Sequence, residues 1–330
     1  MTETEFDIIA HYFQGRQAQP AALSIGIGDD AAVLSLPQKE QLVVTMDTLN
    51  SGVHFPEDTP AADIAWKALA VNLSDLAAMG AVPRYFTLSL CLPRSDPDWL
   101  RAFADALFAC ADAYNVCLVG GDTTRGPLSI SLCAFGGVAQ GAACTRGGAR
   151  AGDRVYVTGT LGDAALGLQI AFARRQARQD HVDYLLQRLR RPTPRLAIGQ
   201  GALAYASAMI DISDGLAADL GHILTASGYG ADIFAAQLPL SESARAAAGL
   251  EELQMLALTG GDDYELCITV PPAKVDAWEC HVQQQAWPVR AIGMLTEGPG
   301  LRVMRPDGSE LDVNHGGYDH FPANNPGDAE

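Results

Sequence analysis

The sequence predicts a protein of the α/β or α+β class with about two domains. Apolar runs of strand length alternate with helical patterns along the whole chain, as is typical of these classes. The chain has 330 residues, 48% of them hydrophobic, which is enough for two domains of roughly 150 residues each. A Gly- and Ala-rich segment, residues 141–153, separates the two halves. We therefore expect an N-terminal domain over residues 1–140, a C-terminal α/β domain over 150–321 and a loose polar tail over 322–330.

Four strands and two long helices are predicted in the first half of the chain. The helix over residues 60–81 opens with a proline, and the helix over 96–115 has Asp96 as its cap. The first strand ends in Asp47, and the third runs into the glycines and aspartate of GGDTT, which we interpret as a turn. The four strand patterns cover residues 41–48, 85–92, 116–124 and 128–139.

The second half repeats this alternation. The segment 208–224 is predicted as a strand that runs directly into a helix at the S-D-G turn, residues 213–215. Further strands are predicted at residues 153–159, 264–270 and 289–295, and further helices at 161–176 and 272–285.

Composition argues against a nucleic-acid or membrane partner. The chain has 39 acidic and 22 basic residues, a net charge of −17, and such a surface repels nucleic-acid phosphates. The N-terminus carries acids where a signal peptide has bases, and no apolar run reaches the ~18 residues of a spanning helix. Seven cysteines without a C-x-x-C pair indicate reduced thiols. We expect a cytoplasmic protein.

Aspartates at recurring positions predict a site for divalent cations. Asp30 lies in a glycine-rich turn, residues 26–34 (GIGDDAAVL), that is shaped for a phosphate but carries two acids. Asp75 stands among apolar residues of a predicted helix, where a buried carboxylate without a partner is costly. The remaining candidates lie at strand ends: Asp47, Asp122, Asp211, Asp214, Asp262 and Asp263. Clustered carboxylates bind Mg²⁺, and the ions would then hold the phosphate.

Each of these residues also has a purely structural interpretation. A single Asp at a strand end is more often a cap or a turn former than a ligand, and for Asp214 the helix cap is a sufficient explanation. The segment 158–167 (TGTLGDAALG) is either an anion site at a helix start or an ordinary strand–helix turn. Arg125 and Arg146 are either triphosphate contacts or surface arginines. Spacing alone leaves these alternatives open.

Motifs of other phosphate-binding classes are missing from the sequence. There is no G-x-x-x-x-G-K-[ST] loop and no H-R-D and D-F-G pair. The G-x-G-x-x-A spacing of residues 26–31 should open a helix if it bound a dinucleotide, but the chain runs into Pro37. No Ser, Cys or His stands in the setting of an activated nucleophile. We therefore expect no covalent catalytic residue.

Eight motifs together resemble one enzyme family, the thiamine-monophosphate kinases. They span the chain from about Thr4 to Phe321 in the family's order: GIGDDAAVL, VVTMDTL with GVHF, KALAVNLSDLAAMGA, LVGGDTT, VTGTLGDAALGL, IDISDGLAADL, TGGDDYEL and GYDHF. The resemblance implies two α/β domains of the aminoimidazole ribonucleotide synthetase-like superfamily, with the N-terminal sheet forming a barrel across a homodimer. It also implies Mg²⁺-dependent transfer of the γ-phosphoryl group of ATP to thiamine phosphate, which gives thiamine diphosphate. We expect direct in-line attack by the substrate phosphate.

The resemblance also assigns roles to residues of this sequence. Metal-binding positions are Asp30, Thr45, Asp47, Asp75, Asp122, Asp211 and Asp214. ATP-contacting positions are Gly121, Asp122, Arg146 and Ser213, and substrate-side positions are His54, Glu265 and Tyr318.

The sequence departs from the family pattern at a few positions. Met46 replaces a more usual Ser or Thr, and Asp262 replaces a more usual Glu. The alternatives are another ATP-using synthetase of the superfamily, or a non-catalytic nucleotide- or thiamine-binding homologue. Selenophosphate synthetases have a reactive Cys near the N-terminus, whereas the first cysteine of this sequence is Cys91. The hydrogenase maturation factor ends in a functional Cys, whereas this sequence ends in Glu330.

Overall fold

Contacts group the chain into two compact units. The computed structural model describes residues 4–18, 20–27, 31–35 and 37–313. The first unit comprises Met1–Thr145 and Arg190–Ala204, and the second Arg146–Leu189 and Tyr205–Glu330. The break between Thr145 and Arg146 falls inside the Gly-rich boundary segment. Residues 190–204, which the sequence analysis placed in the C-terminal domain, group with the first unit instead.

The first unit is built on a four-stranded sheet of order β3-β6-β4-β5. Its strands are β3 (Glu40–Asn50), β4 (Val82–Leu92), β5 (Cys117–Arg125) and β6 (Ser129–Ala139). β6 is antiparallel to both β3 and β4, whereas β4 and β5 are parallel because helix α3 (Pro97–Ala113) connects them. β3 and β5 therefore form the edges of this sheet.

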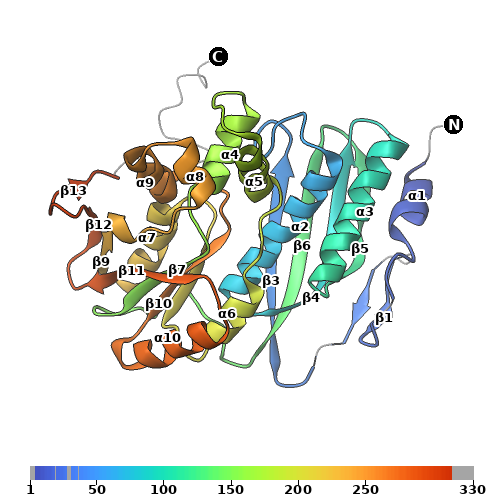
Figure 1. Cartoon of the computed structure of the whole chain (residues 1–330). Helices are drawn as coiled ribbons and strands as arrows, with labels where there is room; N and C mark the ends of the chain where they lie inside the picture. The colour runs from blue at the N-terminus through green and yellow to red at the C-terminus, as the bar shows by residue number, and fades with distance from the viewer. Residues whose placement is uncertain (1–3, 19, 28–30, 36, 314–330) are drawn as a thin grey trace, which may run out of the picture. The chain divides into compact units, whose positions relative to one another are not determined.

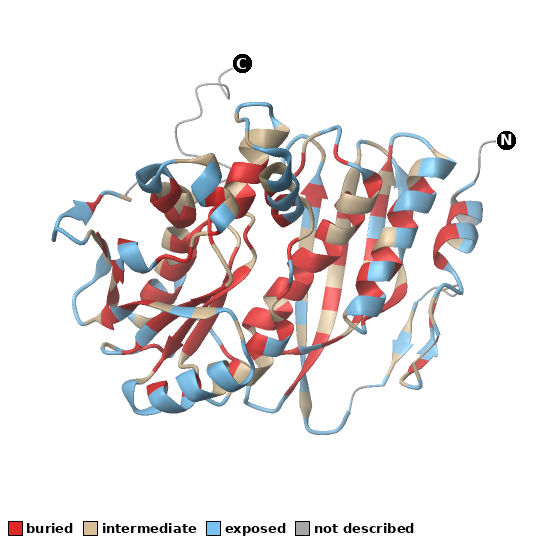
Figure 2. Ribbon diagram, in the orientation of Figure 1, coloured by how far each residue is buried: buried red, intermediate tan, exposed pale blue. Residues whose placement is uncertain are grey.

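Helix α2 (Ala61–Ala78) and helix α3 cover one face of this sheet (Figure 1). α3 is amphipathic, and its apolar side chains Phe103 and Leu107 are fully buried. Its cap is the predicted one, because Asp96 accepts a hydrogen bond from the backbone N–H of Trp99 at 3.2 Å. α2 is buried around most of its circumference, as its colouring in Figure 2 shows, since the sheet, α3 and α6 (Leu196–Ala202) all contact it.

The opposite face of this sheet is only partly covered. A hairpin of β1 (Leu23–Ile25) and β2 (Val33–Leu34) packs there, with Leu23 against Tyr85 and Cys117. On the edge strand β3, three alternate residues that point to this face are exposed and hydrophobic: Leu42 (45% exposed), Val44 (53%) and Met46 (63%). The short helical segments α1 (Glu5–Ile8) and η1 (Ile9–Phe13) precede the hairpin.

Residues 190–204 join the first unit through side-chain and backbone contacts with α2 that chain order cannot reveal. Arg191 Nε donates to Asp63 Oδ1 of α2 at 2.6 Å. A Cβ at Gly199 in α6 would lie 2.0 Å from the carbonyl oxygen of Ala77, so only glycine permits this approach to α2. The segment follows the predicted domain boundary in sequence yet returns to the earlier domain, which explains the difference from the sequence-based bounds.

The second unit is built on a seven-stranded sheet of order β13-β12-β9-β11-β7-β10-β8. Its strands are β7 (Arg154–Thr158), β8 (Ala208–Ile212), β9 (Gly230–Phe234), β10 (Glu265–Val270), β11 (Val289–Thr296), β12 (Gly300–Met304) and β13 (Glu310–Leu311). All neighbours are antiparallel except β9 and β12, which are parallel.

Helices pack on both faces of the seven-stranded sheet. Val155 and Val157 of β7 face the main core together with Leu220 of helix α7. Tyr156, which lies between them, points to the other face and packs edge-on against the buried Trp278, with 6.3 Å between ring centroids. The helices of this unit are α4 (Asp163–Ala171), α5 (Gln179–Arg190), α7 (Leu216–Ser227), α8 (Glu242–Ala247), α9 (Leu250–Thr259) and α10 (Val275–Gln284), with 3₁₀ turns η2 (Ala235–Gln237) and η3 (Pro272–Lys274).

The mixed α/β class is confirmed, and the strands and helices predicted from sequence are present, with three local corrections. Helix α4 ends at Ala171, before its predicted end at residue 176. β3 continues past Asp47 to Asn50, so Asp47 lies within the strand. The glycines and aspartate of GGDTT belong to β5 and pair with β4 beyond a bulge, so this motif is not a turn. No helix in the described part of the chain has the length and hydropathy to cross a membrane. The predicted polar tail lies outside the described residues.

Candidate functional site

Three predicted metal-binding residues meet between strand β3 and helix α2. Thr45 and Asp47 are two residues apart on β3, so their side chains share the face that α2 covers. From α2, the Asp75 carboxylate accepts a hydrogen bond from the Thr45 hydroxyl through Oδ2. The structure therefore places an acidic pair and a hydroxyl together where the sequence predicted ion ligands.

The electrostatics of this group favour a cation. The pKa of Asp47 is raised to about 7, first by burial and second by the negative charge of Asp75. The charge of Asp75 thus opposes ionisation of Asp47, and a divalent cation would relieve that repulsion. The donor set consists of oxygens only, which suits Mg²⁺. These residues therefore fit the ion that the sequence predicts.

Met46 lies outside this group because strand residues alternate between faces. Its side chain is 63% exposed and points to the face opposite Thr45 and Asp47. A hydroxyl at position 46 would not reach the Asp75 carboxylate from that face. The replacement of a Ser or Thr by Met46 therefore removes no side-chain oxygen from the acidic pair.

Asp122 is separated from the acidic pair in the described residues. Asp47 pairs across the sheet with Leu132, which pairs with Leu88. Asp122 pairs with Ser89, the residue after Leu88, and therefore belongs to the neighbouring row of paired residues. Neighbouring rows of a sheet face opposite sides, so the two carboxylates do not share a face. The adjacent Gly121 has φ 153°, and a Cβ there would lie 1.9 Å from the carbonyl oxygen of Leu88, so no other residue fits.

A complete ion shell is not present among the described residues. Within residues 4–18, 20–27, 31–35 and 37–313, no three His, Cys, Asp or Glu side chains gather closely enough to hold a metal ion. Two predicted site residues, Asp30 and Tyr318, lie outside the described residues. Mg²⁺ often binds through one or two carboxylates together with substrate phosphates and waters. Asp47 and Asp75 match that number of carboxylates.

His54, a predicted substrate-side residue, is held in a defined orientation beyond the end of β3. Its Nδ1 accepts the backbone N–H of Asn50 at 3.0 Å, so the neutral ring carries its proton on Nε2. Lys67 of α2, 3% exposed, donates through Nζ to the His54 carbonyl oxygen at 3.2 Å. Sequence reasoning missed Lys67, although a lysine inside the apolar run of a predicted helix was a visible signal.

In the second unit, Asp211 and the S-D-G turn occupy the junction of β8 and α7. Asp211 is buried in β8, and Ser213 and Asp214 follow at the turn. The carboxylate that satisfies this turn belongs to Asp219, whose Oδ2 accepts the N–H groups of Ser213, Asp214 and Gly215 at 3.0–3.1 Å. Asp214 is therefore not the helix cap: the N-cap residue of α7 is Gly215, and the turn before it is fixed by Asp219, which sequence reasoning missed.

The same arrangement occurs at the start of helix α4. Asp263 is fully buried and accepts the N–H groups of Gly162 (2.6 Å) and Ala164 (3.1 Å). Burial raises the pKa of Asp263 to about 7, although the charge of Arg188 and these N–H groups lower it. The anion site considered for residues 158–167 is thus occupied by the chain's own carboxylate. The ordinary strand–helix turn is the better interpretation of that motif.

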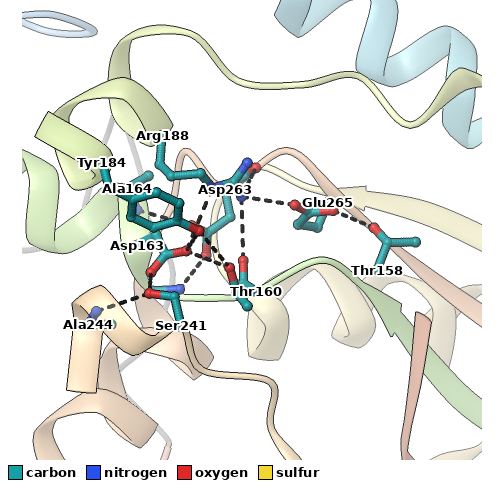
Figure 3. Close-up of polar contacts among 11 residues, drawn as sticks. Thr158, Thr160, Asp163, Ala164, Tyr184, Arg188, Ser241, Ala244, Asp263 and Glu265 are labelled. Carbon is teal, nitrogen blue, oxygen red and sulfur yellow. Dashed lines mark hydrogen bonds and ion pairs between the residues drawn. The ribbon is translucent and has the colours of Figure 1, made fainter. Parts of the chain in front are cut away.

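Glu265, predicted to contact the substrate, is fully buried in a polar cluster with Arg188 of α5 (Figure 3). Arg188 Nη2 donates to Glu265 Oε1 at 2.9 Å, and the Thr158 hydroxyl donates to Oε2 at 2.5 Å. Burial lowers the pKa of Arg188, but the carboxylates of Glu265, Asp263 and Asp163 outweigh it and raise that pKa overall. Asp262 of the same motif is only partly buried.

Asp163 completes this cluster. Its carboxylate accepts hydroxyl hydrogen bonds from Thr160 (2.5 Å), Ser241 (2.5 Å) and Tyr184 (3.2 Å), and Arg188 Nε lies 3.6 Å from it (Figure 3). Sequence reasoning missed both Asp163 and Arg188, because their partners come from distant segments. Arg146, a predicted ATP contact, is exposed, and its carbonyl oxygen accepts the Ser227 hydroxyl at 3.3 Å.

Comparison with known proteins identifies the family. Models of the N-terminal and C-terminal domains of AIR synthase related proteins match residues 28–138 and 150–305. A thiamine-monophosphate kinase of Salmonella typhimurium is 47% identical over 319 residues, which cover 96% of this chain and 98% of that protein.

Two solved structures agree with this relationship. The crystal structure of the thiamine-monophosphate kinase from Stenotrophomonas maltophilia K279a is 47% identical, with a TM-score of 0.82 over 88% of this chain and 93% of that chain. AaThiL complexed with AMPPCP and TMP is 31% identical, with a TM-score of 0.75 over 87% and 89% of the two chains. The chain therefore belongs to the thiamine-monophosphate kinase family of AIR synthase related proteins.

Proposed function

We propose that this protein transfers the γ-phosphoryl group of ATP to thiamine phosphate and releases thiamine diphosphate and ADP. The observation that carries the proposal is the 47% identity to a thiamine-monophosphate kinase over nearly the full length of both chains. A related structure, at 31% identity, holds an ATP analogue and TMP together. The acidic pair between β3 and α2 supports the same chemistry, since two anionic reactants need a cation between them.

Mg²⁺ is the ion that these residues are suited to hold. Thr45, Asp47 and Asp75 would bind it in the first unit, and Asp211 and Asp214 are the candidates for a metal site of the second unit. When bound, the ion would neutralise charge on the phosphate oxygens. The chain's own contribution is to hold the Asp75 carboxylate in place, through the Thr45 hydrogen bond and the packing of α2 on β3. A bound cation would in turn favour the ionised form of Asp47.

Nucleotide binding at the S-D-G turn depends on side chains rather than on backbone N–H groups. All three N–H groups of residues 213–215 already donate to Asp219. Ser213 would therefore contact ATP through its hydroxyl, and Gly121, Asp122 and Arg146 remain the other proposed contacts. Asp219 acts by fixing the turn from which Ser213 and Asp214 project.

Substrate binding is proposed for His54, Tyr318 and the acidic end of the TGGDD turn. His54 would donate from Nε2 to an oxygen of the substrate phosphate, because its Nδ1 is occupied by Asn50. Thiamine carries a fixed positive charge that a carboxylate can face. Glu265 is fully buried and bound to Arg188, so we propose that it stabilises the site without contacting the substrate. We propose that the partly buried Asp262 faces the substrate instead.

Phosphoryl transfer is proposed to be direct, without a phosphoenzyme. The substrate phosphate is already anionic near neutral pH, so it can attack without a strong general base. Incubation of the protein with γ-labelled ATP alone should leave the chain unlabelled. Stoichiometric labelling of the protein would contradict direct transfer.

A homodimer is also proposed, with the four-stranded sheets of two copies joined into a barrel. The edge strand β3 carries Leu42, Val44 and Met46 as an exposed apolar row, and a long exposed edge of this kind is a site for pairing with another strand. A second copy is the partner that presents the same row. Pairing of the two edges would close the sheets and bury both rows.

The decisive assay for the activity measures ADP release with thiamine phosphate and with thiamine, in the presence and absence of Mg²⁺. We expect ADP release only with thiamine phosphate and Mg²⁺, in equal amount to thiamine diphosphate formed. Activity on thiamine alone, or no activity with both substrates and Mg²⁺ present, would refute the proposed function.

A further inference from the structure

Arg188 of helix α5 joins two turns that lie about a hundred residues apart in the sequence (Figure 3). Its Nη2 donates to the carbonyl oxygen of Thr160 at 3.4 Å, within the turn between β7 and α4. The same atom donates to the carbonyl oxygen of Asp263 at 3.3 Å, at the end of the TGGDD turn (residues 259–263), and to Glu265 Oε1 at 2.9 Å, at the first residue of β10. One guanidinium thus contacts both turns at once.

The TGGDD turn is held in a strained conformation. Asp262 and Tyr264 have φ values of 73° and 50°, in the left-handed region that residues with a side chain rarely adopt. Asp263 lies between them and is fully buried. Its carboxylate accepts hydrogen bonds from N–H groups at the start of α4, and its carbonyl oxygen accepts one from Arg188. Such strain persists only where surrounding contacts fix the backbone, and here Arg188 and α4 supply those contacts.

This turn also supports the S-D-G turn beside it. The N–H of Asp262 donates to the carbonyl oxygen of Ser213 at 2.8 Å, and that of Tyr264 donates to Ile212 at 2.8 Å. Gly261 approaches so closely that a Cβ there would lie 2.5 Å from the Ser213 carbonyl oxygen. Any shift of the TGGDD turn would therefore move Ser213 and Asp262 together.

Arg188 is also the cation on which the buried charges of the cluster depend. Three carboxylates, those of Asp163, Asp263 and Glu265, are fully buried around it. Loss of the guanidinium would leave these carboxylates without a compensating charge. Lysine at this position would keep the charge, but its single ammonium nitrogen cannot stand both at the position of Nη2, which contacts the two turns, and at that of Nε, 3.6 Å from Asp163.

We propose that Arg188 is a positioning residue of the enzyme, which holds the strained TGGDD turn so that Asp262 and Ser213 face the ligands. The proposal rests on the proposed function, in which Asp262 meets thiamine phosphate and Ser213 meets ATP. Arg188 itself touches no ligand. It acts by coupling the turn before α4 to the turn before β10, and through the latter to the S-D-G turn.

The test compares Arg188→Lys with the wild-type chain in steady-state kinetics and thermal unfolding. We expect the KM for thiamine phosphate to rise about 10-fold in Arg188→Lys, with kcat within about twofold of wild type, because the ligand groups are displaced while the acidic pair is untouched. The melting temperature should fall by only a few degrees, since the charge is kept. An unchanged KM in a folded Arg188→Lys variant would overturn the proposal and leave Arg188 a stabilising residue only.

Arg175→Lys is the matched control. Arg175 is also a partly buried arginine of the second unit, and it donates to Gln169, to the Ala247 carbonyl oxygen and to Glu252, away from both turns. We expect a similar fall in melting temperature with an unchanged KM. A KM increase equal to that of Arg188→Lys would show that any loosening of this unit has the same effect, and would overturn the specific role.

Hydrogen exchange separates this proposal from the proposed function. In Arg188→Lys the amides of Asp262 and Tyr264, which bond to the S-D-G turn, should exchange at least about 10-fold faster than in wild type and in Arg175→Lys. This result requires no substrate. Faster exchange with no wild-type kinase activity would refute the function and keep the positioning role, whereas unchanged exchange would refute the positioning role whatever the activity.

Discussion

Asp75 gives the strongest prediction for a single residue. Its carboxylate accepts a hydrogen bond from Thr45, and its negative charge raises the pKa of Asp47. Asp75→Asn keeps the shape of the side chain but removes one charge from the acidic pair. We expect turnover to fall at least ~10²-fold, on the scale of a lost electrostatic contact to the transition state, while the melting temperature changes little. The measurement is kcat at saturating Mg²⁺ and both substrates.

The matched control for this variant is Asp98→Asn, an exposed aspartate in the first turn of α3. It loses the same charge away from the acidic pair, so its turnover should match wild type. If Asp75→Asn retained near-normal turnover, Asp75 would have only a structural role in α2.

Asp263 gives a prediction on pH and stability. Its pKa is raised to about 7 by burial, from an ordinary value of 3.8. Between these two pH values the folded protein holds a proton that the unfolded chain has released, so this group's contribution to stability falls as pH rises from about 4 to about 7. The loss amounts to a few kcal/mol at most, at about 1.4 kcal/mol per pH unit.

Urea unfolding of wild type and Asp263→Asn at pH 4.5, 6 and 7.5 tests this effect. The asparagine variant is expected to be less stable overall, because an amide oxygen cannot accept both N–H groups of α4 as the carboxylate does. Its free energy of unfolding should nevertheless fall less steeply with pH than that of wild type. Asp47 and Asp219, whose pKa values are also raised to about 7, contribute to both proteins and cancel in the comparison. Equal slopes would show that Asp263 does not titrate in this range.

Local periodicity explains which elements the sequence could predict. The long helices α2 and α3 and the central strands have clear apolar patterns and caps, and all are present. Short edge strands such as β1, β2 and β13 carry too few residues to show a period. GGDTT was interpreted as a turn because glycines usually break strands, whereas here pairing of β5 with β4 overrides that preference.

The residues of the candidate site also fall into those that local sequence could predict and those that it could not. Thr45, Asp47 and Asp75 could be predicted because strand alternation and helix burial place them from local sequence. Asp219 could also have been found, as an acid in the first turn of a helix that follows a glycine. Arg188 could not, since its partners at Thr160, Asp263 and Glu265 meet it only through tertiary packing.

At the scale of helices, two glycines make a matched pair for testing close packing. Gly199 in α6 leaves no room for a Cβ, which would lie 2.0 Å from a backbone oxygen of α2, whereas Gly221 in α7 has nothing within 4 Å. Gly199→Ala should destabilise the protein by about 1–3 kcal/mol through overpacking. Gly221→Ala should be neutral or stabilise by up to about 1 kcal/mol, because alanine favours the helix.

Chemical unfolding of the two alanine variants measures both effects, and equal stabilities would contradict the close contact between α6 and α2. The result also tests the domain assignment, because Gly199 lies in residues 190–204. This segment follows the second unit's α5 in sequence but packs on α2 of the first unit. Apolar patterning indicates that a segment is buried, but it does not indicate against which earlier element.

At the scale of the whole molecule, the exposed row on β3 predicts self-association. Leu42, Val44 and Met46 alternate with the inward-facing residues of an edge strand that is eleven residues long. Each such side chain contributes about 1.5–3 kcal/mol when fully buried. Strand pairing between two copies would also satisfy the open backbone groups of the edge. A single polar residue at the centre of the row should therefore break the association.

Val44→Glu tests the dimer in sedimentation equilibrium or size-exclusion light scattering. We expect wild type to have twice the mass of a single chain, and Val44→Glu to be monomeric at the same concentration, because pairing would bury two glutamates against apolar neighbours. Leu250→Glu is the control, since Leu250 is 56% exposed at the start of α9 in the second unit, and it should remain dimeric. A monomeric wild type, or a Val44→Glu variant that stays dimeric, would rule out β3 as the interface. Loss of the dimer in Val44→Glu alone, with an unchanged far-ultraviolet circular dichroism spectrum, would place the interface on β3 and exclude unfolding as its cause.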